Sequence, residues 1–431
     1  MPVKSKSKRA GKELPIVVIG GGPAGMTAAQ TAVKEYKNVV LYDKNPIPGK
    51  KLSSIVSDRI LIGKKLSPEK TAEAFGAKGK FIMPALRIFG WKEITDHLEK
   101  MGLSVGLNGE NQLVVSPESA PLVSTSLKKS AESAGVVVKK SSRVTDIEIS
   151  RGVAKGVVVN GVTHPVSAVV VACGSYSSPN LGSTRDGYEM ARKAGHKITP
   201  IKPAMVGLET LERYGKILAG VSIRDCRIDV SLDEKLQFTD RGALTFASYG
   251  LEGDLILNHS ARIIDLLEKG QVTVNIDLMP DKSKSRIEKI LGQGLESSNQ
   301  ITVWKILTRY IPDRLLDGMH KMIRIHSRRP AVRLSNLERK SLAIWLKEFA
   351  FTIKRCRPFN ETRGVLGGVS VDDIDPETMR SKTVKNLYFA GDVLDLLGPC
   401  GGYNIEMAFA TGHLAGLSAA NFNSIKKETT K

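Results

Sequence analysis

The feature that most constrains this chain is a glycine-rich turn that directly follows a short apolar run. Residues 14–19 are apolar and mostly β-branched. Residues 20–25 then read Gly-Gly-Gly-Pro-Ala-Gly and lead into an Ala/Met/Thr-rich segment of helical composition. This order predicts a strand, a tight turn and a helix. A second β-branched run at residues 39–42 ends at Asp43, which is the spacing of a βαβ unit.

The glycines of this turn have a physical reason in nucleotide binding. Gly20 and Gly22 let the backbone reach a pyrophosphate, and Gly25 lets the helix pack closely on the strand. The helix N-terminus adds unpaired N–H groups and positive potential, and Asp43 can accept hydrogen bonds from the ribose of an adenosine. An ordinary glycine turn is the alternative, but the strand before it, the helix after it and the acid at the end of the next strand favour a dinucleotide site.

Beyond this unit, the sequence predicts a first domain that is interrupted by an insert. Alternating and apolar runs predict a small meander that returns to a buried parallel strand, at residues 136–139, 143–150, 152–159 and 166–172. From residue 197 to 357 the pattern changes to shorter alternating strands followed by helical stretches. After residue 358 the first pattern returns, with a strand at 386–390 and a helix that is opened by residues 401–404 and runs to Gly416.

The C-terminal part of the insert combines a predicted helix with strong positive charge. Ser335 and Glu338 form a capping box that opens a helix through residue 349, and Leu337, Ile344 and Trp345 are its predicted apolar stripe. Residues 321–357 carry 11 Lys and Arg against two acids. This cluster predicts either a solvated helix face or a phosphate-binding face, which makes nucleic acid the second choice of partner.

Composition excludes several classes of protein. Lys and Arg number 64 against 44 Asp and Glu, a net charge of +20 that favours contact with anions. No apolar stretch is long enough for a membrane span, and residues 1–13 lack the apolar core of a signal peptide, so they are predicted to be a disordered basic tail. The four cysteines, at 173, 226, 356 and 400, include no CxxC pair. We therefore expect no disulfide framework and no metal site, and reduced thiols in a cytoplasmic protein.

Four segments resemble a family of prokaryotic FAD-dependent oxidoreductases that includes aminoacetone oxidases and bile-acid dienone reductases. They are residues 18–25, 182–188, 387–395 and 401–404, and they occur in family order over nearly the whole chain. The resemblance implies FAD as cofactor and an α/β fold, in which a Rossmann-like FAD-binding domain is interrupted by a β-barrel lobe and a small helical lobe. On this basis the FAD-binding domain covers residues 14–196 and 358–431, and the insert covers 197–357.

The resemblance also implies which residues hold the cofactor. The glycine-rich turn would bind the pyrophosphate, Asp43 the adenosine ribose, and Asp392 the ribityl chain. The backbone of Val144 would contact the adenine, and the helix start at residues 402–404 would face the pyrimidine end of the flavin. The complete predicted set is Gly20, Gly22, Pro23, Ala24, Gly25, Asp43, Lys44, Lys51, Val144, Ala172, Gly174, Gly391, Asp392, Gly402, Tyr403 and Asn404.

On the substrate side the sequence departs from the family pattern. The glycine-rich segment that ends Arg-Cys-Asn has no counterpart in residues 53–59. The Thr-His expected in the insert is missing from residues 247–254, which contain Glu252 and Asp254, and Val365 replaces a threonine. The resemblance therefore supports the cofactor without fixing the substrate.

Two functions follow from these observations. The first is an enzyme that exchanges hydride between flavin N5 and an organic substrate, with Cys400 and Tyr403 as candidate catalytic residues. Packing of the thiol, and a flavin contact through the tyrosine backbone, are the alternatives for these two residues. Because the chain holds one dinucleotide fingerprint, NAD(P)H would bind transiently in the same cleft. The second function is an FAD-stabilised binding protein whose basic insert contacts nucleic acid or an acidic partner.

Overall fold

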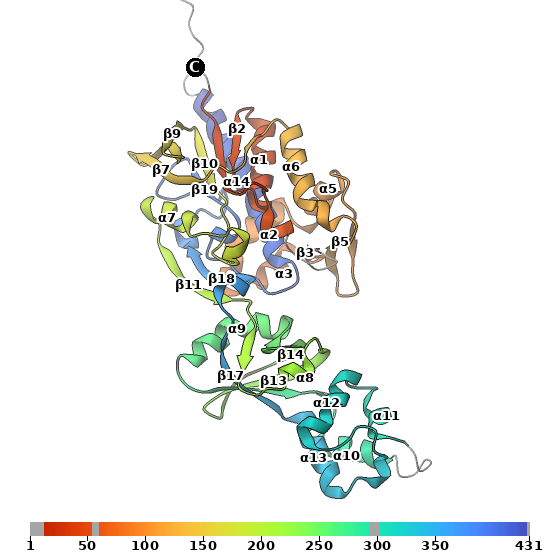
Figure 1. Cartoon of the computed structure of the whole chain (residues 1–431). Coiled ribbons are helices and arrows are strands. Elements are labelled where there is room, and N and C mark those ends of the chain that lie inside the picture. The colour runs from red at the N-terminus through yellow and green to blue at the C-terminus, as the bar shows by residue number, and fades with distance from the viewer. Residues whose placement is uncertain (1–12, 54–59, 294–300, 429–431) are drawn as a thin grey trace, which may run out of the picture. The chain divides into compact units, whose positions relative to one another are not determined.

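The computed structural model describes residues 13–53, 60–293 and 301–428 (Figure 1). The chain divides into two compact units, Met1–Ile201 with Val365–Lys431, and Lys202–Gly364. The predicted boundaries, after residues 196 and 357, lie a few residues before these crossings. The predicted basic tail, apart from residue 13, and most of the divergent segment at 53–59 lie outside the described residues.

The first unit is built on a five-stranded sheet with the order β19-β10-β1-β2-β6. Its strands are β1 (Ile16–Ile19), β2 (Val39–Tyr42), β6 (Val137–Lys139), β10 (Ala168–Val171) and β19 (Leu387–Phe389). All neighbours pair in parallel. Every residue of β1 and β10 is buried, as their continuous β-branched composition predicts for central strands that are covered on both faces.

Two long helices of this unit, α1 (Pro23–Glu35) and α14 (Tyr403–Glu428), pack against each other (Figure 1). The prediction that the second helix ends at Gly416 was wrong. A Cβ atom at Gly412 or Gly416 would collide with the backbone carbonyl of Ala24 or Ala28, so these glycines let α14 approach α1 closely and do not end it. In the described part of the chain, no helix is both long and apolar enough to cross a membrane.

Two small antiparallel sheets complete the first unit. The predicted meander is present in part, as β7 (Val144–Ser150) and β8 (Val153–Val159). Its third strand is β9 (Val162–Pro165), which was not predicted, whereas residues 137–139 belong to the parallel sheet as β6. The other sheet, with the order β3-β5-β4, was not predicted and contains β3 (Ile60–Lys64), β4 (Val105–Leu107) and β5 (Gln112–Val115). The remaining helices are α2 (Lys50–Ser53), α3 (Pro68–Glu73), α4 (Gly79–Ile88), α5 (Trp91–Glu99), α6 (Val123–Ser133) and α7 (Asp186–Lys193).

The second unit contains a closed six-stranded barrel, β12-β15-β14-β13-β16-β17. Its strands are β12 (Leu208–Thr210), β13 (Ser222–Leu232), β14 (Lys235–Ala247), β15 (Gly250–Glu252), β16 (Val272–Asp277) and β17 (Phe349–Cys356). The helices are α8 (Gly215–Leu218), α9 (Asp254–Leu267), α10 (Lys284–Gln293), α11 (Val303–Leu307), α12 (Asp313–Ile323) and α13 (Asn336–Lys347). The unit has its own core, and the α/β fold with an inserted barrel and a helical lobe is confirmed.

Helix α13 starts as predicted but buries a partly different face. The capping box of Ser335 and Glu338 is formed. Leu337 and Ile344 from the predicted stripe are 75% and 46% exposed. Trp345 of that stripe is buried as predicted, together with Leu342 and Leu346, and these three residues have the i, i+3, i+4 spacing of one helix side.

The chain crosses between the two units within two strands that pair with each other. These are β11 (Ile198–Ala204) and β18 (Gly364–Val369), which form a two-stranded sheet. The second unit is therefore an insertion that leaves and returns through neighbouring strands.

Candidate cofactor site

The turn between β1 and α1 contains glycines of two kinds. Gly20 has a φ of +109°, and a Cβ atom there would collide with the carbonyl of Ala172, while a Cβ atom at Gly25 would collide with the carbonyl of Gly20. The protein's own packing therefore requires these two glycines. Gly22 is different, because its φ is −79° and a Cβ atom there would meet no atom within 4 Å. The open space at Gly22, at the N-terminus of α1, fits a bound pyrophosphate.

Asp43 supports this turn from the end of β2. Its carboxylate is 6% exposed and accepts hydrogen bonds from the backbone N–H of Gly21 and of Asn45, both at 2.7 Å. Burial raises the pKa of Asp43, and the backbone hydrogen bonds and the charge of Lys44 oppose this increase. A carboxylate has about four acceptor positions, so two hydrogen bonds leave capacity for the ribose hydroxyls that the sequence assigns to Asp43.

The carboxyl ends of three neighbouring strands meet beside the start of α1. The N–H of Ala172, after β10, donates to the carbonyl of Ile19 at 2.9 Å. Gly391, after β19, has a φ of +72°, and a Cβ atom there would lie 2.8 Å from Cβ of Ala24. At Gly174 a Cβ atom would meet nothing within 4 Å. Such an edge, where parallel strands end beside a helix N-terminus, is where open α/β sheets bind nucleotides.

Two predicted cofactor residues from distant parts of the sequence lie together. Lys51, on α2, donates from Nζ to Oγ of Ser177 at 2.6 Å and to Oδ2 of Asp392 at 3.3 Å. The lysine and aspartate side chains are 39% and 31% exposed. An ion pair with this exposure is weak, so either partner can exchange it for a polar ligand group.

Two further predicted residues belong to the end of the site assigned to the adenosine. Val144 is buried as the first residue of β7. Burial lowers the pKa of Lys44, and the nearby carboxylate of Asp186 opposes this effect. That carboxylate is held by Arg143 at 2.7 Å. The contact between the Val144 backbone and adenine stays a prediction.

The start of α14 contains the remaining predicted cofactor residues, and each has a contact within the protein. Gly402 has a φ of +93°, and a Cβ atom there would collide with the backbone N of Gly63 in β3. The buried ring of Tyr403 packs edge-on against Phe75, with 6.4 Å between centroids. The side chain of Asn404 accepts from the N–H of Gly398 at 2.7 Å and donates to its carbonyl at 2.9 Å. These contacts fix the loop before α14, and the flavin contacts assigned to it stay predictions.

The two candidate catalytic residues differ in their surroundings. Burial raises the pKa of Tyr403, so its hydroxyl keeps its proton at neutral pH. Cys400 is a half-buried cysteine three residues before it. Catalysis by either side chain stays a prediction. Among the described residues, no group of three or more His, Cys, Asp or Glu side chains is arranged to hold a metal ion.

Glu406, in the first turn of α14, is a residue of this region that the sequence did not single out. The residue is 1% exposed, and its Oε2 accepts a hydrogen bond from the N–H of Lys64 at 3.4 Å. Burial raises the pKa of this carboxyl to about 8. The space for it comes from Gly63, where a Cβ atom would lie 2.6 Å from Oε2. An acid in the first turn of a helix is common at the surface, so the sequence carried no signal of its burial.

Comparison with known families places this geometry in context. Residues 14–418 match the HI0933-like protein Rossmann domain family. The chain belongs to this family. It is an FAD-dependent oxidoreductase with FAD as its cofactor, as the sequence motifs predicted.

Relatives of the chain match it along almost its entire length. It is 28% identical to the 3-dehydro-bile acid delta(4,6)-reductase of Clostridium scindens, over 94% of this chain and 98% of that protein. It is 24% identical to the ribosomal RNA dihydrouridine synthase of Haemophilus influenzae, over 93% and 97%. A crystal structure of the 3-ketosteroid delta1-dehydrogenase from Sterolibacterium denitrificans has a TM-score of 0.53 and 10% identity, over 94% of this chain and 99% of that one. The structural match shows a shared fold.

Proposed function

We propose that this protein is a reductase that uses NAD(P)H and its FAD to saturate a carbon–carbon double bond conjugated to a carbonyl group. The observation that carries the cofactor assignment is the open space at Gly22, where the strand ends and a helix N-terminus form a cradle that the protein's own packing does not explain. The type of bond is suggested by two relatives, because a 3-dehydro-bile acid delta(4,6)-reductase and a dihydrouridine synthase are both named for reducing a ring double bond.

In this proposal the protein contributes binding and electrostatics, while bound FAD supplies hydride transfer. The turn at residues 20–25 holds the pyrophosphate, and Asp43 keeps that turn in place through the N–H of Gly21. Lys51 and Asp392 contact the chain between pyrophosphate and ring. The N-terminus of α14 places positive potential at the pyrimidine end, where negative charge develops on reduction.

As first choice of substrate we propose a small organic molecule with a conjugated ring ketone. The bile-acid reductase has the highest identity of the relatives described above. Residues 247–254 of the insert depart from the family pattern, which agrees with a substrate that differs from those of other family members. Tyr249 donates to Glu252 at 2.9 Å, and Glu252 pairs with Arg363 at 2.5 Å, so Glu252 has partners within the protein.

A second candidate substrate is a uridine base within RNA. The observation that favours it is the basic segment of residues 321–357. Some of its cations are compensated, since Arg329 pairs with Glu338 and Lys347 with Asp277. Others are exposed side chains around α12 and α13, namely Lys321, Arg324, Arg328, Arg333 and Lys340. Exposed cations of this kind, which have no ion pair among the described residues, suit a phosphate backbone.

The test uses purified protein with FAD under anaerobic conditions. The flavin is reduced by light, and its reoxidation is followed after mixing with a steroid 4,6-dien-3-one or with unmodified ribosomal RNA. Rapid reoxidation by the dienone supports the first substrate, and reoxidation by RNA that slows steeply with salt supports the second. A flavin that neither compound reoxidises overturns the proposed reaction. RNA binding without reoxidation would instead indicate the binding protein described above.

A further inference from the structure

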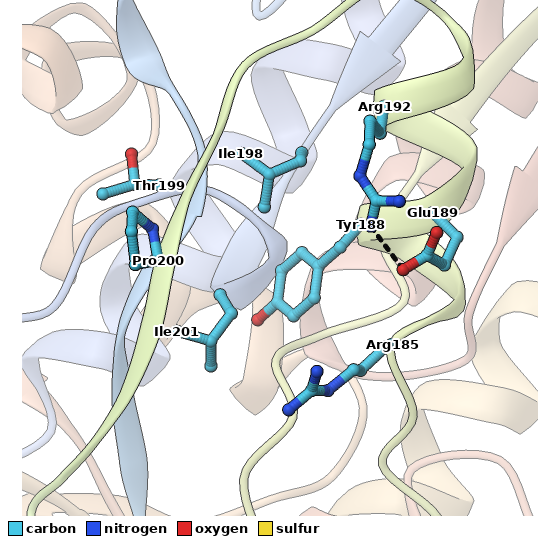
Figure 2. Close-up of a pocket in the computed structure, with 8 residues that line it drawn as sticks. All are labelled: Arg185, Tyr188, Glu189, Arg192, Ile198, Thr199, Pro200 and Ile201. Carbon is cyan, nitrogen blue, oxygen red and sulfur yellow. Dashed lines mark hydrogen bonds and ion pairs between the residues drawn. The ribbon is translucent and has the colours of Figure 1, made fainter.

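A pocket of about 240 Å³ lies in the first unit between α7 and β11 (Figure 2). One wall comes from α7 and the residue before it, through Arg185, Tyr188, Glu189 and Arg192. The other wall is residues 198–201 of β11. Figure 2 shows the Tyr188 ring extending from the helix toward the strand, with Ile198 and Ile201 on the strand side.

The pocket has a cationic rim and an apolar, aromatic floor. The guanidinium of Arg192 pairs with Glu189 at 2.5 Å. The guanidinium of Arg185 lies over the ring of Tyr176, 4.8 Å from its centroid, and forms no ion pair within the described part of the chain. Stacking leaves the N–H edge of a guanidinium available for an anion. The pocket lining contains two arginines and one glutamate, so it favours an anionic group. Its apolar and aromatic side chains favour a ligand in which that group is attached to a flat or apolar one.

A short loop connects this pocket to the candidate cofactor site. The hydroxyl of Tyr188, in the pocket, accepts a hydrogen bond from the backbone N–H of Tyr176 at 3.3 Å. The loop that contains Tyr176 follows β10 and also provides Ser177, which accepts from Lys51 of the Lys51–Asp392 pair. A ligand in the pocket would thus contact Tyr188, a side chain that is hydrogen-bonded to the loop that also provides Ser177 to Lys51.

We propose that this pocket binds the phosphate-bearing part of the nicotinamide dinucleotide that reduces the flavin, with Arg185 as its phosphate contact. The inference rests on the proposed function, in which NAD(P)H is the reductant. The sequence has one dinucleotide fingerprint, which FAD occupies, so the donor needs contacts elsewhere. Arginine binds phosphate oxygens through paired N–H groups, and the apolar floor suits a base or a ribose face.

The reaction balances with the reactants named. NAD(P)H loses a hydride to the oxidised flavin and leaves as NAD(P)⁺. The two electrons then pass with that hydrogen to one carbon of the substrate double bond, and a proton from water adds to the other carbon. Arg185 takes no part in these transfers, so it should affect donor binding alone.

The experiment measures the anaerobic rate of flavin reduction against the concentration of NADPH and of NADH. We expect Arg185→Gln to raise the dissociation constant of the donor about tenfold or more, because a charged hydrogen bond is lost, and to leave the limiting rate unchanged. Arg185→Glu should raise the dissociation constant of the donor further. A contact to the 2′-phosphate would limit the effect to NADPH, whereas a contact to the pyrophosphate would affect both donors.

Arg87→Gln is the matched control, because Arg87 is an exposed arginine of α4 that pairs with Glu69 outside the pocket. It should leave the donor's dissociation constant unchanged. An Arg185→Gln protein with the concentration dependence of the wild type overturns the inference.

The proposed function can fail separately from this inference. A wild-type flavin that neither NADPH nor NADH reduces overturns the pocket assignment, even where light-reduced protein still reduces a dienone. Conversely, a donor response that depends on Arg185, without any substrate that reoxidises the flavin, supports the pocket and overturns the proposed reaction.

Discussion

The two glycine-rich turns of the first unit look alike in sequence but differ in physical cause. At the β1–α1 turn, the conformation of Gly22 is accessible to any residue and the space beside it is open. At the start of α14, Gly402 has a positive φ and lies against the backbone of Gly63. No contact or backbone conformation within the described part of the protein requires a glycine at position 22. At position 402, the backbone conformation and the contact with Gly63 both require one.

This difference shows what a glycine motif can say about a ligand. Where a Cβ atom would collide with the chain, the fold alone explains the glycine, and the motif is weak evidence of binding. Where a Cβ atom would meet open space in an ordinary conformation, a bound group is the better explanation. The cofactor assignment is therefore stronger at Gly22 than at Gly402, and the following predictions test that contrast.

The largest expected effect is on folding, from Gly402→Ala. A residue with a side chain at a positive φ costs about 1–3 kcal/mol, and the collision with Gly63 adds a packing cost of similar size. Thermal and denaturant unfolding should show this loss of stability even in protein stripped of FAD. Gly109→Ala is the control, because a Cβ atom there meets nothing within 4 Å, and its stability should stay within about 0.5 kcal/mol of the wild type. If Gly402→Ala and Gly109→Ala are equally stable, the protein does not require a glycine at position 402 and the contrast with Gly22 is wrong.

The next effect is on the cofactor, from Gly22→Val. The side chain would enter the space assigned to the pyrophosphate, so FAD should bind at least about tenfold more weakly, and the protein should purify with little flavin absorbance. The stability of the FAD-free protein should change little, unlike that of Gly402→Ala. Gly106→Val, at another open glycine in β4, should keep its flavin. Full flavin absorbance in Gly22→Val would show that the open space is not the pyrophosphate site.

A smaller effect is expected from Asp43→Asn. The two backbone N–H groups at 2.7 Å need two acceptor oxygens, and an asparagine amide provides one. The unmatched N–H should cost about 1–3 kcal/mol, measured by denaturant unfolding, and FAD binding should weaken with it. Asp146→Asn changes a surface ion pair with Lys193 and should cost less than about 1 kcal/mol. Unchanged FAD affinity in Asp43→Asn would mean that Gly21 needs no such support.

The last prediction concerns the pH dependence of stability and is tested with Glu406→Gln. Because burial raises the pKa of Glu406 to about 8, the folded protein holds a proton between roughly pH 4.5 and 8 that the unfolded chain has lost. The free energy of unfolding should therefore fall as pH rises through this range and then level off. Glu406→Gln should remove one proton's share of that slope, as measured by denaturant unfolding from pH 5 to 9. Parallel curves for the two proteins would contradict the buried, protonated acid.

The sequence predicted those parts of the fold in which a short local pattern is enough to determine the structure. Strands β1, β2 and β10 are short runs rich in β-branched residues, and they were placed to within a few residues. The barrel was expected only through the family resemblance, since its short alternating strands do not show by themselves that a sheet closes. The length of α14 was missed because Gly416 has the local form of a helix end, and its reason lies in α1, nearly 400 residues earlier.

The candidate site was predictable as a set of segments but not as a set of contacts. The family resemblance implied that Lys51 and Asp392 serve one cofactor, yet Ser177, which accepts a hydrogen bond from Lys51, had no motif of its own. The burial of Glu406 depends on Gly63, a residue on a different strand. The pocket between α7 and β11 was likewise not predicted, although Arg185 and Tyr188 belong to the family segment at residues 182–188.

The order of strands in the central sheet also determines how the chain can fold during synthesis. Strand β10 lies between β1 and β19, but more than 200 residues separate Val171 from Leu387. At ribosomal rates of 5–20 residues per second, one hydrogen-bonding edge of β10 waits roughly 10–40 s for its neighbour. During this time the second unit, with a core of its own, is completed. The nascent chain therefore carries a finished barrel while an apolar strand edge is unpaired, which makes the first unit the part most in need of a chaperone.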